Sequence, residues 1–500
     1  MSAPAQTSSG AAAEARPLAH PGIALLVLVT CQLMVALDGN AMNIALPTIQ
    51  QDLDFSPTNL AWVANAYTLT FGGLLLLGGR AGDILGRRRL FILGIIVFTL
   101  ASLTGGLAQT DEWLLASRIL QGVGAAFAAP GTLALIATNF AEGKARDRAL
   151  GAVTAAYGLS VVLGMILGGV LTSWLGWRSV LFINVPIGAV LVVLTPRFVN
   201  ESARHPGRFD LAGALTSTLG IAAVVYGFIH AASTSWTAGR TVAALVGGVV
   251  LLSAFVFIES RAEQPVLPLR LFRDRNRSGS YSNILLLSAP LVGASFLSTL
   301  FLQNVLGYGA LRAGLAFLPM CAGLFIGGGV ASGLLRRTGA KPLILFGTAL
   351  IIIGSAWLTQ LSVDSTYAAG ILGPMVLLGM GPGFAFTALN QSILSGVPQS
   401  DAGAASGFLE SMQWGGGALG LAVLVAVFGT ASQSAAREPH PGLAPDVLER
   451  TVLADGMATA FIAGAVLAAA GFIITLAVIR RRRAAAEPEA ALPTVEPALP

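Results

Sequence analysis

Long apolar stretches recur along the whole chain, and they limit the folds that it can adopt. Fourteen stretches of roughly eighteen residues or more carry few charges, and about 20 apolar residues are enough for an α-helix to cross a bilayer. Only helices and closed barrels satisfy their own backbone hydrogen bonds in hydrocarbon, so we expect all fourteen to be helices. They lie at about 22–47, 60–80, 90–109, 113–139, 149–172, 179–196, 211–231, 241–260, 282–304, 313–335, 342–361, 368–396, 403–429 and 455–480. Charged residues make up 11 % of the chain, against about 25 % in soluble domains, which excludes a water-soluble globule.

The basic residues give the expected orientation. If the N-terminus is cytoplasmic, the Lys and Arg residues gather in the cytoplasmic loops and tails, as the positive-inside rule requires. The exceptions are Arg118, within a span, and five residues on the outer side: Arg178, Arg240, Arg312, Arg437 and Arg450. We therefore predict a multi-pass protein of the cytoplasmic membrane with both termini inside. Each basic cluster adjoins a span, so a nucleic-acid partner is not expected, and the first apolar stretch is too long for a cleavable signal peptide.

A faint internal repeat indicates how the spans are grouped. The loop 85–88 after the second span resembles the loop 338–341 after the tenth, eight spans later. Two six-helix halves separated by two extra helices would produce that offset, and parallel repeats of this kind are typical of secondary transporters. The predicted division is an N-terminal half at 21–200, two inserted helices at 201–277 and a C-terminal half at 278–480. Residues 1–20 and 481–500 are predicted to be disordered tails.

A lone acid lies deep in the first span. Asp38 has no basic neighbour in its own helix, and an acid at that depth costs about 2.5–3.5 kcal/mol even on lenient insertion scales. It therefore predicts a site that takes up and releases a proton, unless it lies near a helix end and reaches water or a neighbouring donor. Arg118 shares a helical face with Gln121 and Gly122, so it should point into the bundle. It is either a partner that senses the protonation of Asp38 or a structural arginine that holds two helices together.

Glu410 is the other acid deep within a span. With Gln413 and Trp414 it forms a polar and aromatic stripe at helical spacing. We interpret it as a second proton-binding or cation-recognising site, in the C-terminal half. The alternative is a carboxyl group that only hydrogen-bonds within the bundle.

The loop after the second span combines glycines with charges. Gly79, Asp83, Gly86 and Arg87 lie in the run 79–89, where glycine permits a tight reversal and the charges can pair across helix ends. Such a pairing could hold two helix bundles together in one conformation and separate in another. By charge alone, the run could equally be an ordinary cytoplasmic loop.

Five motifs, in the same order along the chain, resemble one family of transporters. The run 79–89 resembles the signature of the major facilitator superfamily, and 118–125 is similar to the helix-4 motif of its proton-coupled drug exporters. Gly158 with 164–169 resembles their helix-5 antiporter motif. The runs 37–47 and 177–188 are similar to motifs of the fourteen-helix branch, the drug:proton antiporters.

This resemblance implies a major facilitator fold and proton-coupled drug efflux. It implies proton coupling at Asp38 and Arg118, and relatives carry acids in the helix that holds Glu410. It also implies a conformational role for the motif residues Gly79, Asp83, Gly86, Arg87, Gly158, Gly164, Gly168 and Gly169. The chain departs from the pattern at Met165, where the family has proline, and at Asn40, where it often has threonine.

A drug pocket should be apolar and aromatic with a few polar anchors. The candidates for substrate binding are Trp62, Asn65, Tyr67, Asn390, Phe408, Gln413 and Trp414. Each of these residues could instead face lipid or pack in the core.

The sequence offers no sign of catalysis or of a bound cofactor. The four histidines lie in loops, tails or at helix ends without metal-ligand spacing, and no Gly-Lys-Ser/Thr phosphate loop is present. We therefore predict that the chain is not an enzyme, needs no cofactor or metal and works as a monomer with small molecules and protons as its partners. The predicted function is proton-coupled efflux of apolar or cationic small molecules across the bacterial cytoplasmic membrane. The alternatives are a dedicated exporter of one endogenous metabolite or antibiotic, an uptake symporter and a membrane receptor.

Overall fold

A computed structural model describes residues 20–202, 210–262, 269–398, 401–438 and 444–480. All regular structure in these ranges is helical, and fourteen helical segments are long and apolar enough to cross a membrane. The predicted helical membrane fold is therefore confirmed. The elements are α1 (Pro21–Asp52), α2 (Ala61–Leu85), α3 (Arg87–Gly106), α4 (Asp111–Asn139), α5 (Lys144–Leu175), α6 (Arg178–Phe182), α7 (Asn184–Phe198), α8 (Leu211–Ser233), α9 (Gly239–Arg261), η1 (Leu269–Arg273), α10 (Arg275–Leu300), η2 (Phe301–Val305), α11 (Ala310–Ala316), α12 (Leu318–Thr338), α13 (Ala340–Leu358), η3 (Tyr367–Ile371), α14 (Leu372–Leu394), α15 (Ala402–Ala435) and α16 (Pro445–Ala477).

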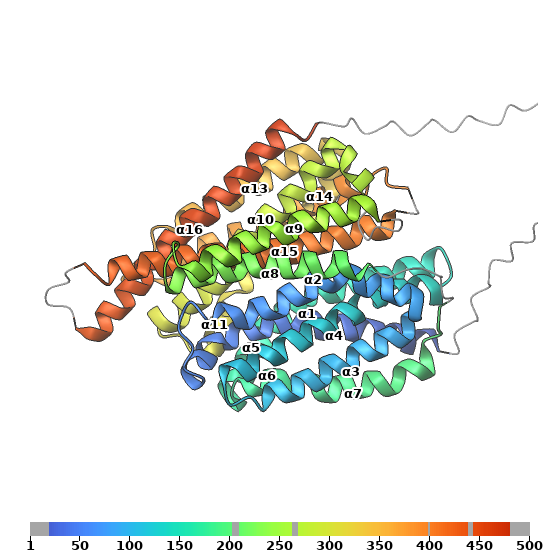
Figure 1. The fold of residues 1–500 in the computed structure, drawn as a ribbon, viewed down its shortest axis with the longest axis horizontal. Coiled ribbons are helices and arrows are strands. Elements are labelled where there is room, and N and C mark those ends of the chain that lie inside the picture. Colours follow the sequence, from blue (N-terminus) through green and yellow to red (C-terminus); the bar gives the residue numbers. More distant parts are fainter. Residues whose placement is uncertain (1–19, 203–209, 263–268, 399–400, 439–443, 481–500) are drawn as a thin grey trace, which may run out of the picture.

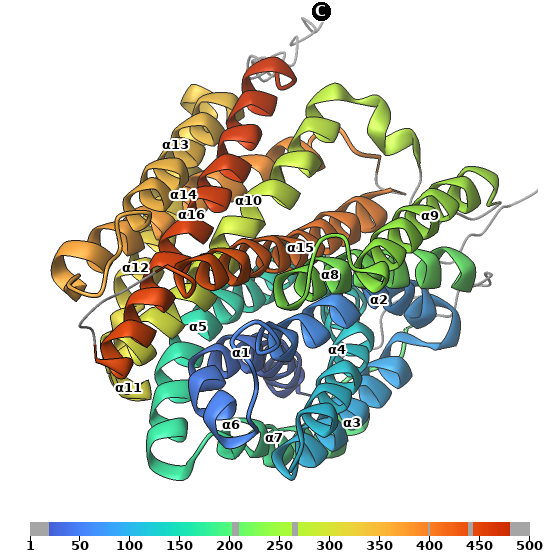
Figure 2. The ribbon, with the colours of Figure 1, turned by 60° about the vertical axis from the view of Figure 1, so that its left-hand side comes forward.

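The helices form two bundles with a helix pair beside them (Figures 1 and 2). Helices α1–α7 pack mainly with one another, and so do α10–α16. The pair α8 and α9 packs on itself, and α8 also packs on α2 and α15, one helix from each bundle. We call the two bundles the N-terminal and C-terminal halves. The division at residues 200 and 278 stays a prediction, and α10 begins three residues before the second boundary, at Arg275.

Corresponding turns in the two halves use glycine for the same physical reason. Gly86, between α2 and α3, has φ +108°, and Gly339, between α12 and α13, has φ +76°. Residues with a Cβ rarely adopt such angles, so each turn requires glycine. These are the two loops in which the sequence shows its internal repeat.

The sixth span is broken near its start. It consists of the short helix α6 and of α7, with the break at Ile183. Pro186, in the first turn of α7, has no backbone N–H and cannot donate to the carbonyl group four residues earlier. The break places Asn184 at the start of α7, where its side chain is buried.

Hydrogen bonds join the two halves at one end of the molecule. We call the end that carries Arg87–Arg89 and Arg336–Arg337 the basic end. At the opposite end, the amide of Gln303 donates to the carbonyl oxygen of Ile44 at 2.9 Å, and the backbone N–H of Leu311 donates to the hydroxyl of Ser173 at 3.1 Å. Toward the basic end, α13 and α16 tilt away from the N-terminal half (Figure 1).

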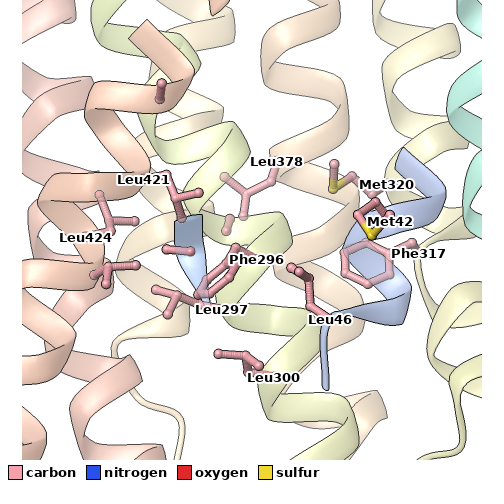
Figure 3. Packing of buried hydrophobic residues seen from close by; sticks show 14 of the residues in the cluster. Met42, Leu46, Phe296, Leu297, Leu300, Phe317, Met320, Leu378, Leu421 and Leu424 are labelled. Atoms are coloured by element: carbon pink, nitrogen blue, oxygen red, sulfur yellow. The ribbon is translucent and has the colours of Figure 1, made fainter. Parts of the chain in front are cut away.

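Apolar packing strengthens this contact between the halves. Met42 and Leu46 of α1 lie among Phe296, Phe317 and Met320 of the C-terminal half (Figure 3). All five side chains are buried. Helix α1 therefore belongs to the N-terminal half but supplies part of the core that joins the two halves.

The last two spans extend beyond their apolar segments. Helix α16 begins at Pro445, about ten residues before the predicted start at 455, and α15 continues to Ala435, past the predicted end at 429. The added turns of α16 carry charges, including an Arg450–Asp446 pair one turn apart, with 3.7 Å between Nη2 and Oδ2. Hydropathy marks only the part of a helix that suits hydrocarbon, so it does not detect such polar turns.

Candidate functional site

The Asp38 carboxylate lies in a fully buried polar cluster inside the N-terminal half. Its Oδ2 accepts a hydrogen bond from Arg118 Nη1 at 2.5 Å. Its Oδ1 accepts from Asn184 Nδ2 at 2.7 Å and from Gln121 Nε2 at 3.2 Å. Asp38 and Arg118 have relative exposures of 0 % and 1 %. In this conformation Asp38 therefore contacts neighbouring donors inside the bundle and not water at a helix end.

Arg118 has several partners besides the carboxylate. Its Nε donates to the carbonyl oxygen of Val63 at 3.0 Å, and its Nη1 donates to Gln121 Oε1 at 2.8 Å. Its guanidinium also lies over the ring of Tyr67, 4.5 Å from the centroid, in a cation–π contact. The Tyr67 hydroxyl in turn donates to the carbonyl oxygen of Val35 at 3.1 Å. These contacts tie α4 to α1 and α2.

A second layer of polar groups orients the first. Ser102 of α3 accepts from Gln121 Nε2 at 2.8 Å, while its own hydroxyl donates to the carbonyl oxygen of Phe98. Asn184 Nδ2 also approaches the Ser102 oxygen, at 3.4 Å. Four elements besides α1 therefore contribute to the cluster: α2, α3, α4 and α7.

The Asp38–Arg118 pair is sensitive to the loss of either charge. Removing one partner of a buried ion pair typically costs about 3–5 kcal/mol, because the other charge is left uncompensated. Protonation of Asp38 would remove the negative charge in the same way. Arg118 would still have Val63, Gln121 and Tyr67 as partners, so the cation can stay in place while α1 is released from it.

Asn184 and Ser102 are functional candidates that the sequence did not single out. Asn184 falls inside the run 177–188, which the sequence analysis used only as a family motif. The available signal was an amide two residues before Pro186 in an apolar span. Ser102 gave no comparable signal, because serine in a membrane helix commonly bonds its own backbone.

The glycines of α5 allow two close contacts on different faces. A Cβ at Gly168 would lie 2.6 Å from the Ala41 carbonyl oxygen, and one at Gly164 would lie 2.6 Å from the Asn40 Cβ, so this face packs on α1 next to Asp38. A Cβ at Gly158 would meet the ring of Phe325 at 2.6 Å, and one at Gly169 would lie 2.9 Å from the backbone of Ala310. Helix α5 therefore lies between the Asp38 segment and the C-terminal half.

Asp83 and Arg87 of the loop 79–89 pair with each other within the N-terminal half. Asp83 accepts from Arg87 Nε at 2.9 Å, and a Cβ at Gly79 would lie 3.8 Å from Pro130 of α4. Glu201, just after α7, accepts from the backbone N–H of Arg88 at 2.9 Å. In this conformation, the hydrogen bonds of Asp83 and Arg87 among the described residues join no helix of the C-terminal half.

Glu410 lies apart from the Asp38 cluster, on α15. It is half-buried, and its carboxylate is within electrostatic range of the Tyr157 hydroxyl on α5. The hydrogen bonds of the Asp38 cluster, within the described part of the chain, all stay inside the N-terminal half. The two acids therefore form two separate candidate sites.

The predicted substrate-binding residues do not gather in one place. Tyr67 belongs to the Asp38 cluster, and Trp62 packs against Tyr226 of α8 with ring centroids 6.3 Å apart. Asn65 is buried, and neither amide atom has a hydrogen-bond partner. Asn390 of α14 is exposed, and Gln413 is half-buried on α15.

Phe408 and Trp414, also on α15, contact different neighbours. Phe408 stacks edge-on against Tyr281, with ring centroids 4.8 Å apart. Trp414 contacts Phe71 of α2 at a centroid distance of 4.9 Å, across the boundary between the halves. A Cβ at Gly72 would lie 2.7 Å from the Trp414 Cβ, so this approach depends on glycine.

Within the described ranges, no group of three or more His, Cys, Asp or Glu side chains could hold a metal ion.

Comparison with known proteins gives consistent matches over most of the chain. A family model described as Major Facilitator Superfamily matches residues 28–421. The cephamycin export protein CmcT of Amycolatopsis lactamdurans is 42 % identical over 83 % of this chain and 86 % of its own length. The puromycin resistance protein pur8 of Streptomyces alboniger is 39 % identical over 95 % of this chain and 94 % of its own.

A solved structure shows the same fold. A bacterial homologue of the human lysosomal transporter Spinster, in an inward-facing and occupied conformation, aligns with a TM-score of 0.64 over 90 % of this chain and 95 % of that chain. The sequence identity is 15 %, so this likeness concerns the fold alone.

Proposed function

This chain belongs to the Major Facilitator Superfamily, and from that premise we propose that it exports apolar or cationic small molecules across the bacterial cytoplasmic membrane in exchange for protons. The observation that carries the proposal is the fully buried Asp38–Arg118 pair in the membrane-spanning region, 2.5 Å between Oδ2 and Nη1. A buried ionisable group in a transporter is expected to serve the transported ion or substrate. In the described part of the chain, the cluster offers a proton acceptor and no metal site.

In the proposed cycle, a proton from outside neutralises Asp38 and weakens its attraction to Arg118. The α1 segment that carries Asp38 packs on Gly164 and Gly168 of α5, and other glycines of α5 pack on the C-terminal half. A shift of α1 would therefore change how the halves pack. Rocking of the halves would then expose the substrate site to the cytoplasm, where substrate binding favours release of the proton.

The other motif residues have proposed roles in the same cycle. We propose that Asp83 and Arg87, paired here within their own loop, exchange partners when the halves close at the basic end. Glu410 would serve as a second site for a proton or a cationic substrate, on the C-terminal side. The predicted substrate contacts stay proposals: Trp62, Asn65, Tyr67, Asn390, Phe408, Gln413 and Trp414.

A pH-gradient experiment with Asp38→Asn tests the proposal. Asparagine has almost the same shape and can still accept from Arg118, but it carries no ionisable proton. In proteoliposomes loaded with ethidium or puromycin, we expect the variant to keep downhill movement and to lose transport driven by the pH gradient. The matched control is Asp52→Asn, at the end of the same helix, where the carboxylate pairs with Arg178 at 2.6 Å in an exposed position. Full pH-gradient-driven transport by Asp38→Asn would refute the assignment.

A second candidate is a dedicated exporter of one antibiotic. The names of two similar proteins favour it, since one is a cephamycin exporter and the other a puromycin resistance protein. A panel of toxic compounds in an efflux-deficient host separates the two. Protection against a single scaffold indicates the dedicated exporter, and protection against several unrelated scaffolds indicates the broad one.

We further propose that the protein is a monomer with both termini in the cytoplasm. The basic loops at one end support this orientation through the positive-inside rule. Reporter fusions that are active on only one side of the membrane test the orientation, and light scattering after size exclusion tests the oligomeric state.

A further inference from the structure

An apolar cavity of about 370 Å³ lies where the helix pair α8–α9 meets the two halves. Its walls come from α2, α8, α9 and α15, and η1 supplies Leu269 and Phe272. The volume is within the usual range for small-ligand sites, about 300–1,000 Å³. The cavity is separate from the Asp38 cluster, because none of its lining residues belongs to that cluster.

The lining of the cavity suits a hydrocarbon chain. All lining residues are apolar or glycine except Ser217 and Ser411. The Ser217 hydroxyl is already bonded to the carbonyl oxygen of Ala214, while the buried Ser411 hydroxyl has no partner. One hydroxyl group is too little to hold a polar ligand or a group of ordered waters, since a buried water needs two to four polar partners.

Part of the cavity lining is exposed at the surface of the helices, in a segment that we expect to lie in the bilayer. Val256 of α9 is 54 % exposed and Leu269 of η1 is 37 % exposed, although both line the cavity. Both residues lie within a few positions of the basic end of their elements. A cavity that is apolar and open to the bilayer is filled from the bilayer, where acyl chains are the abundant apolar groups.

Two arginines near the opening of the cavity favour a lipid with an anionic headgroup. Arg261 ends α9, is exposed, and stacks on Phe257 at 4.9 Å, and Arg273 is exposed at the end of η1. Three acids near the rim belong to the described residues, and each is paired, caps a helix or is buried. Asp401 forms a two-point ion pair with Arg270, at 2.8 Å to Nε and 2.5 Å to Nη2. Asp274 caps the N-terminus of α10, and Glu259 is buried. The hydrogen bond and charge of Asp401 raise the pKa of Arg270, so the guanidinium stays protonated, and the pair fixes η1 to the start of α15.

We propose that this cavity binds an acyl chain of an anionic phospholipid from the leaflet at the basic end, with the headgroup beside Arg261 and Arg273. The bound chain fills the space between the inserted helices and the contact of α2 with α15. It therefore acts as a spacer between the helix pair and the two moving halves. This inference does not depend on export or on proton coupling.

Photo-crosslinking tests the proposal in vesicles. The purified protein is reconstituted with phosphatidylglycerol that carries a diazirine on its acyl chain or, in a parallel arm, with phosphatidylcholine that carries the same group. We expect crosslinks on peptides containing Phe255 and Met412, with stronger labelling by phosphatidylglycerol. One arginine near an anionic surface changes partitioning by about fivefold, so Arg273→Gln should reduce the preference by about that factor.

A cavity-filling variant gives the matched comparison. A Cβ at Gly415 would meet only Ile221 Cδ1, at 3.9 Å, so Gly415→Leu can extend its side chain into the cavity. It should abolish the crosslinks and reduce the rise in melting temperature that phosphatidylglycerol gives to the wild type. Gly329→Leu, at an exposed position of α12 with no atom within 4 Å of its Cβ, should change neither.

Three outcomes would overturn the proposal: unchanged crosslinking in Gly415→Leu, equal labelling by both lipids, or labelling confined to helices away from the cavity. Crosslinking is measured without transport. A loss of proton exchange in a correctly labelled protein would therefore count against the proposed function and not against the lipid site.

Discussion

The Asp38–Arg118 pair makes an asymmetric prediction about pH and stability. Arg118→Gln leaves a buried carboxylate without its cation, and Asp38→Asn leaves a buried guanidinium without its anion. Each change breaks a fully buried pair, for which the expected cost at about pH 8 is roughly 3–5 kcal/mol of unfolding free energy. The cost of Asp38→Asn should lie at the lower end, because Arg118 keeps its bonds to Val63 and Gln121 and its contact with Tyr67.

The two variants should then respond differently to acid. In Arg118→Gln the stranded carboxylate can lose its charge by taking up a proton, so most of the loss should disappear as the pH falls from about 8 to about 5. In Asp38→Asn the arginine cannot give up its proton in this range, so the loss should stay constant. The double variant has no stranded charge and should lose less than the sum of the single losses.

Unfolding in detergent micelles with increasing dodecyl sulfate, followed by far-ultraviolet circular dichroism, measures these differences. Asp52→Asn is the control, because its ion pair with Arg178 is exposed and should be worth less than about 1 kcal/mol. A loss in Arg118→Gln that is the same at both pH values would refute the reasoning. Additive losses in the double variant would also refute it.

Three further predictions concern residues around the cluster and between the halves. Asn184→Leu removes a donor that lies 2.7 Å from the buried Asp38 carboxylate, which costs the ionised form about 1.5–3 kcal/mol. The pH midpoint of proton-driven transport should therefore move upward by about one to two units. An unmoved midpoint would show that Asn184 does not contact Asp38 during turnover. Gly168→Ala places a Cβ 2.6 Å from the Ala41 carbonyl oxygen, so α1 and α5 must move apart. The transport rate should fall at least tenfold, because a cost of about 1.4 kcal/mol corresponds to a factor of ten. Gly151→Ala on the same helix, where no atom lies within 4 Å of the added Cβ, should transport normally. Asn65→Leu removes a buried amide that has no hydrogen-bond partner. It should raise the unfolding free energy of this conformation by about 1–3 kcal/mol and slow turnover. A lower melting temperature would show that the amide is hydrogen-bonded.

The number and kind of helices followed from the sequence because hydrocarbon leaves few choices. A backbone in lipid must satisfy its own hydrogen bonds, which favours helices. The length of each apolar stretch was therefore enough to locate each membrane-spanning helix. The ends were harder to place, since the polar turns at the start of α16 carry no hydropathy signal. The break at Ile183 was not predicted either, although Pro186 is a sufficient cause.

The candidate site was only partly predictable. A charge in an apolar span is conspicuous, so Asp38 and Arg118 could be paired from the sequence, and the structure places them in contact. Their neutral partners depend on which helix faces meet, and hydropathy does not contain that information. For the same reason the predicted substrate residues fell on several surfaces, with Asn390 exposed and Phe408 in an aromatic cluster.

The central claim is that Asp38 changes its ionisation during turnover, and infrared difference spectroscopy measures this directly. Addition of a transported compound to the protonated protein should remove a carboxylic-acid C=O band and produce a carboxylate band. The bands of Asp38 should disappear in Asp38→Asn and remain in Glu410→Gln, which removes any contribution from the other deeply placed acid. Difference bands that persist unchanged in Asp38→Asn, or a wild type that transports without any such bands, would contradict the account.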